Sequence, residues 1–313
     1  MSSFSYSAVI PNYNDGDEIK HSLECLSNQT RPFDEILIID DGSTDNSVSI
    51  IESIIKDIPY ARLIRNETNL GIVNTVNRGM KEAKGDFVFA ASANDSFDTR
   101  ILEWAEEVLD QHPNVGMVCG NTLIVYDQTG ERRKVCFPIE QKTSAFYSDE
   151  LRKIASKRFI SLFGGATILR RKEALELGGF LKELEWNSDW HLFLMMADKY
   201  GVGYVPEVFC NVHVTPGQYS SAAADWSKQS QIIRNIIRIT KDRYPDQISL
   251  FRDCALLPTY DIQAIWLIIS NKDLRYYLSW LLLYRLVFFK VARVVASVIP
   301  RNIRGKIRPL FRL

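Results

Sequence analysis

Two adjacent carboxylates, Asp40 and Asp41, directly follow an apolar run at residues 36–39 and precede Gly42. At the carboxyl end of a buried strand, such a pair would lie where open α/β sheets bind their ligands. A carboxylate there can accept the imino N–H of a nucleoside base. The alternative is a pair of aspartates that cap a helix on a tight turn. This segment by itself leaves both interpretations open.

A further carboxylate, Asp95, follows Asn94 at the end of the next-but-one predicted strand. One carboxylate beside an amide can hold a divalent cation against a diphosphate, because Mg²⁺ commonly takes one or two protein carboxylates plus phosphate oxygens. The alternative is an N-cap for a helix that begins near Asp98. In isolation the segment is more typical of a cap, and capping is compatible with metal binding.

Asp189 lies at the predicted start of a helix, between Trp186 and Trp190. The helix dipole stabilises a carboxylate there as the anion. Such a carboxylate can still act as a general base toward a substrate hydroxyl within hydrogen-bond reach. The two tryptophans could form a platform for a sugar ring, and simple capping of the helix is the alternative.

His213 lies near the end of a predicted strand, just before a turn that contains Pro216 and Gly217. Its imidazole could contact a metal ion or a diphosphate. A lone histidine is more often a packed or surface residue, so the assignment depends on what lies around it.

The composition of the chain indicates which class of protein must position these residues. The chain has 313 residues, 46% of them hydrophobic and 24% charged, which is typical of a globular protein with ample area for a core. A formal net charge of zero argues against a generic nucleic-acid binder. The five cysteines are widely spaced without a C-x-x-C pair, which argues against a disulfide framework or a structural zinc site. With no secretory signal pattern at the start, we expect a reduced, cytoplasmic compartment.

The first hundred residues alternate short apolar runs with helical patterns, which is typical of βαβ units and a largely parallel sheet. We predict strands at 7–10, 35–39, 61–65 and 86–91, with the first of them ending at Pro11, and helices at 17–27, 72–83 and 98–111. The next elements are a hairpin of 115–126 with 131–137, a strand region at 159–169, and helices at 172–177 and 189–200. Beyond about residue 222 the pattern is helical.

The order and spacing of these segments resemble glycosyltransferase family 2. The resemblance covers roughly residues 5–222. It rests on ordered motifs at 9–14, 40–45, 69–86, 164–180 and 188–190. It implies a GT-A fold, a Rossmann-like three-layer α/β/α sandwich with a mostly parallel central sheet. The domain would comprise a nucleotide-binding half at 1–113 and an acceptor half at 114–222, followed by a helical extension at 223–313.

The activity implied by the resemblance is inverting transfer of a sugar from a nucleotide-diphosphate sugar, UDP- or dTDP-linked, to a hydroxyl of a glycan or lipid-linked saccharide. Such transfer would serve the assembly of surface polysaccharide or a glycoconjugate. Asp189 would deprotonate the acceptor hydroxyl, Asp95 would bind Mg²⁺ or Mn²⁺, and His213 would lie near the metal or diphosphate. The implied donor-binding residues, with Asp41 reading a uracil-type base, are Pro11, Tyr13, Asp40, Asp41, Gly71, Asn94 and Asp95. The implied acceptor-binding residues are Gly164, Gly165, Trp186 and Trp190.

Several positions depart from the family pattern. Asn94 and Ser92 stand where the family has acidic residues, and Val76 stands where it often has Arg or Lys. Ser188 replaces the acid before the catalytic position. These losses motivate an alternative, a non-catalytic nucleotide- or sugar-binding scaffold. A nucleotidyltransferase would need a glycine-rich loop with Lys or Arg after the first strand, and residues 11–16 contain no basic side chain.

The C-terminal tail is apolar and basic. Residues 271–313 contain ten Lys or Arg and one acid, and Arg285, Lys290 and Arg293 interrupt the apolar stretch 276–299. Charges at that density argue against a transmembrane span. We expect an in-plane amphipathic helix on the cytoplasmic face of a membrane with anionic lipids. The alternative is a helix packed on its own domain or on a second copy of the chain in a homodimer.

Overall fold

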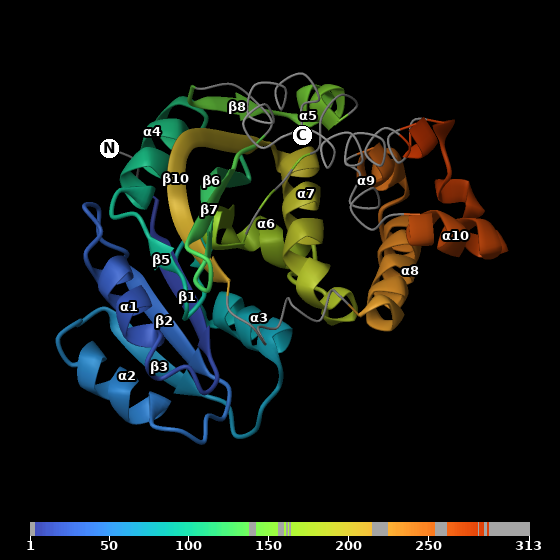
Figure 1. Cartoon of the computed structure of the whole chain (residues 1–313). Coiled ribbons are helices and arrows are strands. Elements are labelled where there is room, and N and C mark those ends of the chain that lie inside the picture. The colour runs from blue at the N-terminus through green and yellow to red at the C-terminus, as the bar shows by residue number, and fades with distance from the viewer. Residues whose placement is uncertain are drawn as a thin grey trace. The chain divides into compact units, whose positions relative to one another are not determined.

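The computed structural model describes residues 4–137, 142–155, 160, 162, 164–214, 225–253, 262–280, 282–284 and 287. The chain forms two compact units (Figure 1). The first contains residues 1–151 and 161–222, and the second contains 152–160 and 223–313.

A single mixed sheet organises the first unit. Its main path runs β3-β2-β1-β4-β9-β6-β10-β5, with β7 paired to β6 and β8 paired to β10. The strands are β1 Tyr6–Asn12, β2 Glu35–Asp40, β3 Ala61–Arg65, β4 Phe87–Ala90, β5 Ser96–Phe97, β6 Met117–Tyr126, β7 Glu131–Val135, β8 Ser144–Phe146, β9 Thr167–Arg170 and β10 Val202–Val214. Strands β1, β2, β3, β4, β6 and β10 all run in the same direction, and β9 runs against its neighbours β4 and β6. The predicted mostly parallel sheet and the predicted hairpin, now β6 with β7, are confirmed.

Helices cover both faces of this sheet. Helices α1 Ile19–Ser27, α2 Ser47–Ile55 and α4 Ile101–Gln111 pack on one face, where their apolar residues share a core cluster with alternate residues of β1, β2 and β4. Helices α3 Ile72–Glu82, α6 Arg171–Glu176 and α7 Ser188–Tyr200 lie on the other, and Figure 1 shows α3 opposite α1 and α2. Gly79 permits close approach of α3, since a Cβ there would lie 2.2 Å from Cγ1 of Val9. The predicted three-layer α/β/α arrangement is therefore confirmed.

Strand β1 continues through Pro11, so the prediction that Pro11 ends this strand is wrong. Pro11 and Asn12 pair with Ile39 and Asp40 of β2. In a regular strand the N–H and C=O of one residue point to the same side, and every second residue points to the same neighbouring strand. The Val9 carbonyl points toward β4 and accepts the Ala91 N–H, so the backbone of Pro11 faces that side too. The missing N–H of Pro11 therefore faces the side on which β4 has already ended at Ala90, and it removes no ladder bond.

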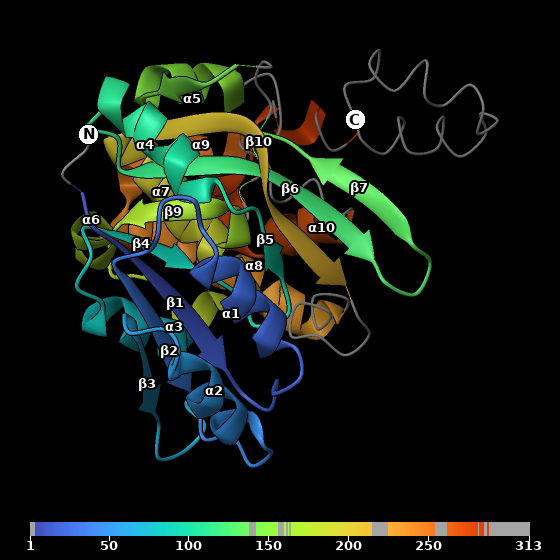
Figure 2. The ribbon, with the colours of Figure 1, turned by 90° about the vertical axis from the view of Figure 1, so that its left-hand side faces the viewer.

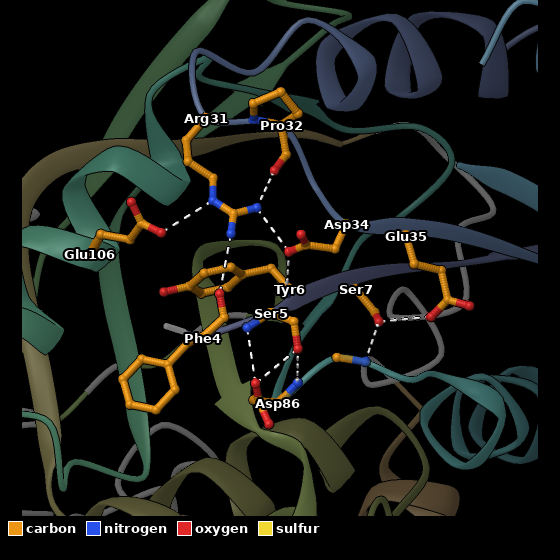
Figure 3. Close-up of polar contacts among 11 residues, drawn as sticks. Phe4, Ser5, Tyr6, Ser7, Arg31, Pro32, Asp34, Glu35, Asp86 and Glu106 are labelled. Atoms are coloured by element: carbon orange, nitrogen blue, oxygen red, sulfur yellow. Dashed lines mark hydrogen bonds and ion pairs between the residues drawn. The ribbon is translucent and has the colours of Figure 1, made fainter. Parts of the chain in front are cut away.

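The amino-terminal edge of the sheet is tied together by polar contacts (Figure 3). Arg31 donates to Glu106 at 3.1 Å and to Asp34 at 2.8 Å, and the Ser7 hydroxyl donates to Glu35 at 2.8 Å. A hollow of about 350 Å³ at this edge is lined by Glu35 and Arg62, which pair with each other at 2.9 Å. The Glu35 carboxylate is thus already paired with Arg62 at this edge.

The second unit is helical, as the sequence pattern predicts. It contains α8 Trp226–Arg243, α9 Ile248–Asp253 and α10 Ile262–Ser270, with 3₁₀ turns at Pro245–Gln247 and Lys272–Tyr277. Asp225 caps α8 by accepting the Ser227 N–H at 2.9 Å. Within the described part of the chain, no helix is long and apolar enough to cross a membrane. Most of the predicted amphipathic tail at 276–299 lies outside the described residues.

Candidate active site

The carboxyl-terminal edge of the sheet gathers most of the residues singled out in the sequence. Strands β1, β2 and β10 end at Asn12, Asp40 and Val214. Strand β9 runs in the opposite direction, so the 3₁₀ turn Gly164–Ala166 that precedes it reaches the same edge. Parallel strands of open α/β sheets bind ligands at this edge.

Asp95 is held by contacts from distant parts of the chain. It is 5% exposed, and its Oδ1 accepts the backbone N–H of His213 at 3.2 Å. The Ser22 hydroxyl of α1 lies 2.6 to 3.0 Å from the carbonyl oxygens of residues 92, 93 and 95. Helix α4 begins only at Ile101, and Asp98 accepts the Arg100 N–H ahead of it. The Asp95 carboxylate is thus directed to β10 and does not cap a helix.

The surroundings of Asp95 favour a cation. Burial raises the pKa of its carboxyl to about 6. Hydrogen bonds from the His213 N–H, Ser92 and Cys210, and the charge of the His213 side chain, lower this pKa but do not outweigh burial. Among the described residues no Lys or Arg forms an ion pair with Asp95. A desolvated carboxylate without a Lys or Arg partner fits a divalent cation whose remaining ligands are substrate and water oxygens. The described part of the chain holds no group of three His, Cys, Asp or Glu that could bind a metal by itself.

Asp189 lies in the first turn of α7 and is half-buried. It accepts the N–H of Trp190 at 2.6 Å and a backbone hydrogen bond from Gly164. Burial raises the pKa of its carboxyl to about 6, and these backbone hydrogen bonds act in the opposite direction. The N-cap position belongs to Asn187, and no side chain caps this helix. The carboxylate therefore faces the Gly164 turn.

Two consecutive glycines, Gly164 and Gly165, lie next to the Asp189 and Asp95 carboxylates. A Cβ on Gly164 would lie 3.5 Å from Oδ2 of Asp189, and a Cβ on Gly165 would lie 3.5 Å from Oδ2 of Asp95. The Asp95 and Asp189 carboxylates, 94 residues apart in the chain, therefore approach the same two-residue turn. Gly165 is further constrained because its Cβ would lie 2.7 Å from the Cys210 sulfur.

Asp40 and Asp41 hold the neighbouring loops. Asp40 is fully buried and accepts from the Asn12 side-chain amide at 2.9 Å. Asp41 accepts from Asn66 at 2.6 Å and from the N–H groups of Leu70 and Gly71 at 2.9 Å each. Gly71 precedes α3 with φ of 84°, a conformation that favours glycine. Asp41 thus positions the start of α3, and its recognition of a base stays a prediction.

The aromatic residues of the predicted site differ in exposure. Tyr13 follows β1 and is 44% exposed, whereas Pro11 beside it is buried. Trp190 is 6% exposed and Trp186 is half-buried. Of the two tryptophans, Trp186 therefore presents more surface to a sugar ring. Asn94, which adjoins Asp95, is also half-buried.

His213 Nδ1 lies 3.0 Å from a carboxylate oxygen of Asp127, in the turn between β6 and β7. A carboxylate partner on one ring nitrogen orients the imidazole and sets its tautomer, as it does for many metal-binding histidines. Neither Asp127 nor Ser22 is a candidate in the sequence. Their roles follow from the pairing of β6 with β10 and the packing of α1, which no local pattern reveals.

Residues 7–178 match the family model described as glycosyl transferase family 2. This match covers more than half of the chain, so the protein belongs to glycosyltransferase family 2.

Curated relatives of the chain are also described as glycosyltransferases. The chain is 40% identical over 109 residues to YibD, an uncharacterized glycosyltransferase of Escherichia coli, covering 33% of this chain and 31% of the relative. It is 25% identical over 288 residues to an uncharacterized glycosyltransferase of Haemophilus influenzae, covering 87% and 88%. It is also 25% identical over 214 residues to a poly-β-1,6-N-acetyl-D-glucosamine synthase of Staphylococcus epidermidis, covering 63% and 47%. The chain thus spans less than half the length of the first and third of these relatives.

Solved structures share the fold. S. aureus TarS 1–349 in complex with UDP-GlcNAc superimposes with a TM-score of 0.58 at 17% identity, covering 92% of this chain and 91% of that one. The mannosyltransferase PcManGT from Pyrobaculum calidifontis, in complex with GDP-Man and Mn²⁺, gives 0.61 at 18% identity, covering 99% and 86%. At such identities the likeness shows the fold alone, which is GT-A.

Proposed function

We propose that this protein transfers a sugar, with inversion, from a UDP- or dTDP-linked donor to a hydroxyl of a glycan or lipid-linked saccharide. The observation that carries the proposal is the approach of Asp95 and Asp189 to the turn at Gly164 and Gly165. Inverting transfer needs a charged diphosphate and a basic group near one anomeric carbon. The similarity to a polysaccharide synthase supports a role in surface polysaccharide or glycoconjugate assembly.

The donor would bind along the carboxyl ends of β1, β2 and β4. Tyr13 offers an exposed ring above the end of β1, and Asp41 holds the backbone of Leu70 and Gly71 beside it. The structural neighbours were solved with UDP-GlcNAc and with GDP-Man, which supports a nucleotide-sugar donor without deciding its base.

Asp95, with the neighbouring His213, is the residue that would hold Mg²⁺ or Mn²⁺. When bound, the cation supplies positive charge that stabilises the leaving diphosphate. This chain supplies the buried Asp95 carboxylate, oriented by the His213 N–H. Mn²⁺ in the PcManGT complex supports the choice of a divalent metal.

Asp189 would remove the proton from the acceptor hydroxyl as that oxygen attacks the anomeric carbon. A general base works best when its pKa lies near the working pH, and burial brings the pKa of this carboxyl to about 6. Gly164 has no side chain, so the substrate can approach the Asp189 carboxylate from the side of this turn.

A donor panel tests the proposal. The full-length protein is incubated with UDP-, dTDP- and GDP-sugars, and released nucleoside diphosphate is measured with Mn²⁺ or with EDTA. We expect release from a uracil- or thymine-linked donor that EDTA abolishes. If thermal shifts report nucleotide binding but no sugar is ever released or transferred, the non-catalytic scaffold is correct instead.

The pH profile of turnover gives a second check. We expect kcat/KM to fall as the pH is lowered through about 6, because a protonated Asp189 cannot accept the hydroxyl proton. An ordinary aspartate would keep its activity to about two pH units lower. The measurement is product release between about pH 4.5 and 8 at saturating metal. A profile that stays flat down to pH 5 would contradict the role of Asp189.

The C-terminal tail would attach the enzyme to the cytoplasmic face of a membrane, next to a lipid-linked acceptor. This part of the proposal rests on the sequence, with its excess of Lys and Arg after residue 271. A homodimer through the same tail is the competing prediction, and sedimentation with vesicles of anionic lipid distinguishes the two.

A further inference from the structure

The hairpin of β6 and β7 carries three consecutive cations next to the candidate site. Arg132, Arg133 and Lys134 are all exposed, and β7 pairs with no other strand besides β6 in the described sheet. Figure 2 shows the two strands of this hairpin side by side. No Asp or Glu among the described residues forms an ion pair with these cations.

The register of the sheet shows which face each cation occupies. Arg132 pairs with Val125, which pairs in turn with His213. Lys134 pairs with Leu123, and Leu123 pairs with Asn211. Paired residues point to the same face and successive residues alternate. Arg132 and Lys134, which we call the basic strip, therefore share a face with His213, while Arg133 points to the opposite face.

The face of the basic strip is the one that carries the proposed base. Cys210 of β10 belongs to the core cluster on the α1 and α4 side, and Val212 packs against that cluster. His213 therefore points to the other side of the sheet, where α7 contacts both β6 and β10. Asp189 is in the first turn of α7. Adjacent strands are about 4.8 Å apart, which places the backbone of Arg132 roughly 10 Å from that of His213.

The acidic side chain near the basic strip does not neutralise its positive charge. The nearby acid, Asp127, already pairs with His213 at 3.0 Å. On the opposite face of β7, Arg133 has Glu131 as its neighbour two residues away. The two faces of the strand therefore differ, with only cations on the side of the site.

We propose that Arg132 and Lys134 bind a phosphate group of the acceptor, so that the acceptor is a phosphate-bearing saccharide. This inference rests on the proposed function, because the strip is an acceptor contact only if transfer takes place at Asp189. The donor diphosphate is assigned to Asp95 and its cation, so the strip serves a second anionic group. Charged residues on an edge strand also prevent pairing with other chains, but that purpose would not distinguish Arg132 from Arg133.

The test uses Arg133 as a matched control on the same strand. Binding of inorganic tripolyphosphate to the full-length protein is measured by calorimetry in EDTA, so that no cation at Asp95 contributes. We expect Arg132→Gln and Lys134→Gln each to weaken binding roughly three- to five-fold, whereas Arg133→Gln changes it by less than about two-fold. Equal losses in all three variants, or no binding by the wild type, would overturn the proposal.

Two further arms separate the possible failures. Binding of UDP with Mn²⁺ should be the same in all three variants, and its absence in the wild type would count against the donor site and not against the strip. Vesicles of phosphatidylcholine with phosphatidylglycerol test for a membrane. Variant-sensitive binding to these vesicles without tripolyphosphate binding would assign the strip to lipid headgroups and overturn its role with the acceptor.

Discussion

Asp189→Asn is expected to lower turnover by at least about 100-fold, because a positioned general base usually contributes about 10²–10⁴-fold. The amide has nearly the same shape as the carboxylate and can still accept the Trp190 N–H, but it cannot take a proton from the acceptor. The measurement is kcat for sugar transfer at saturating donor and metal. Binding of the nucleoside diphosphate should stay unchanged, because Asp189 forms its hydrogen bonds with the N–H groups of Trp190 and Gly164 and not with Asp41 or Asp95.

The same substitution should leave the protein at least as stable as the wild type. Burial raises the folded pKa of Asp189 from 3.8 to about 6. Between these values the native state retains a proton that the unfolded state loses, so stability falls as the pH rises. At pH 7 the ionised carboxylate thus costs up to roughly 3 kcal/mol. Loss of one acceptor for Gly164 offsets part of the gain, and we expect a Tm equal to or a few degrees above the wild-type value.

Asp198→Asn is the matched control for Asp189→Asn. Asp198 lies in the same helix, is buried, and accepts from the Ser148 hydroxyl at 2.7 Å. Its substitution should leave kcat within about two-fold, apart from effects on stability. If Asp189→Asn and Asp198→Asn both keep a kcat near the wild-type value, Asp189 is not the general base.

Asp95→Asn is expected to abolish metal-dependent transfer, with a loss of at least about 100-fold, since a bound cation contributes several kcal/mol of charge stabilisation. Wild-type protein should show a Tm increase with Mn²⁺ and UDP together, because a ligand that binds only the native state stabilises it by mass action. The Asp95→Asn variant should lose this increase while its Tm without ligand stays near the wild-type value.

Asp98→Asn is the control here, since Asp98 lies three residues further on and its carboxylate accepts the Arg100 N–H ahead of α4. It should retain the metal-dependent increase in Tm and full transfer. If Asp95→Asn behaves in the same way as this control, the metal is held elsewhere or is not needed.

The order of the elements and the layered fold could be predicted from the sequence, because the periodicity of apolar residues directly reports burial. The pattern predicts a helix at 72–83, and α3 runs from Ile72 to Glu82. The strand through Pro11 was missed, because the cost of the absent N–H depends on where the neighbouring β4 ends. That is a property of the sheet and not of the local sequence.

The candidate site was predicted in part. Asp95 and Asp189 could be selected by type and position, and the structure brings both to the same pair of glycines. Sequence could not show that Asp95 is directed toward His213 and not toward a helix, because that contact spans 118 residues. Asp127 and Ser22 were missed for the same reason, since a serine inside a helix and an aspartate in a turn have no distinguishing local pattern.

The long separation between Asp95 and His213 has a consequence for synthesis on the ribosome. The backbone group that orients Asp95 belongs to the end of β10, the last strand along the described part of the chain. A nascent chain can form β1 to β4 early, but its Asp95 carboxylate stays without this support until residue 213 has left the exit tunnel. If Asp95 has the role proposed above, translation products that stop short of β10 should therefore be inactive, because their Asp95 lacks the His213 N–H.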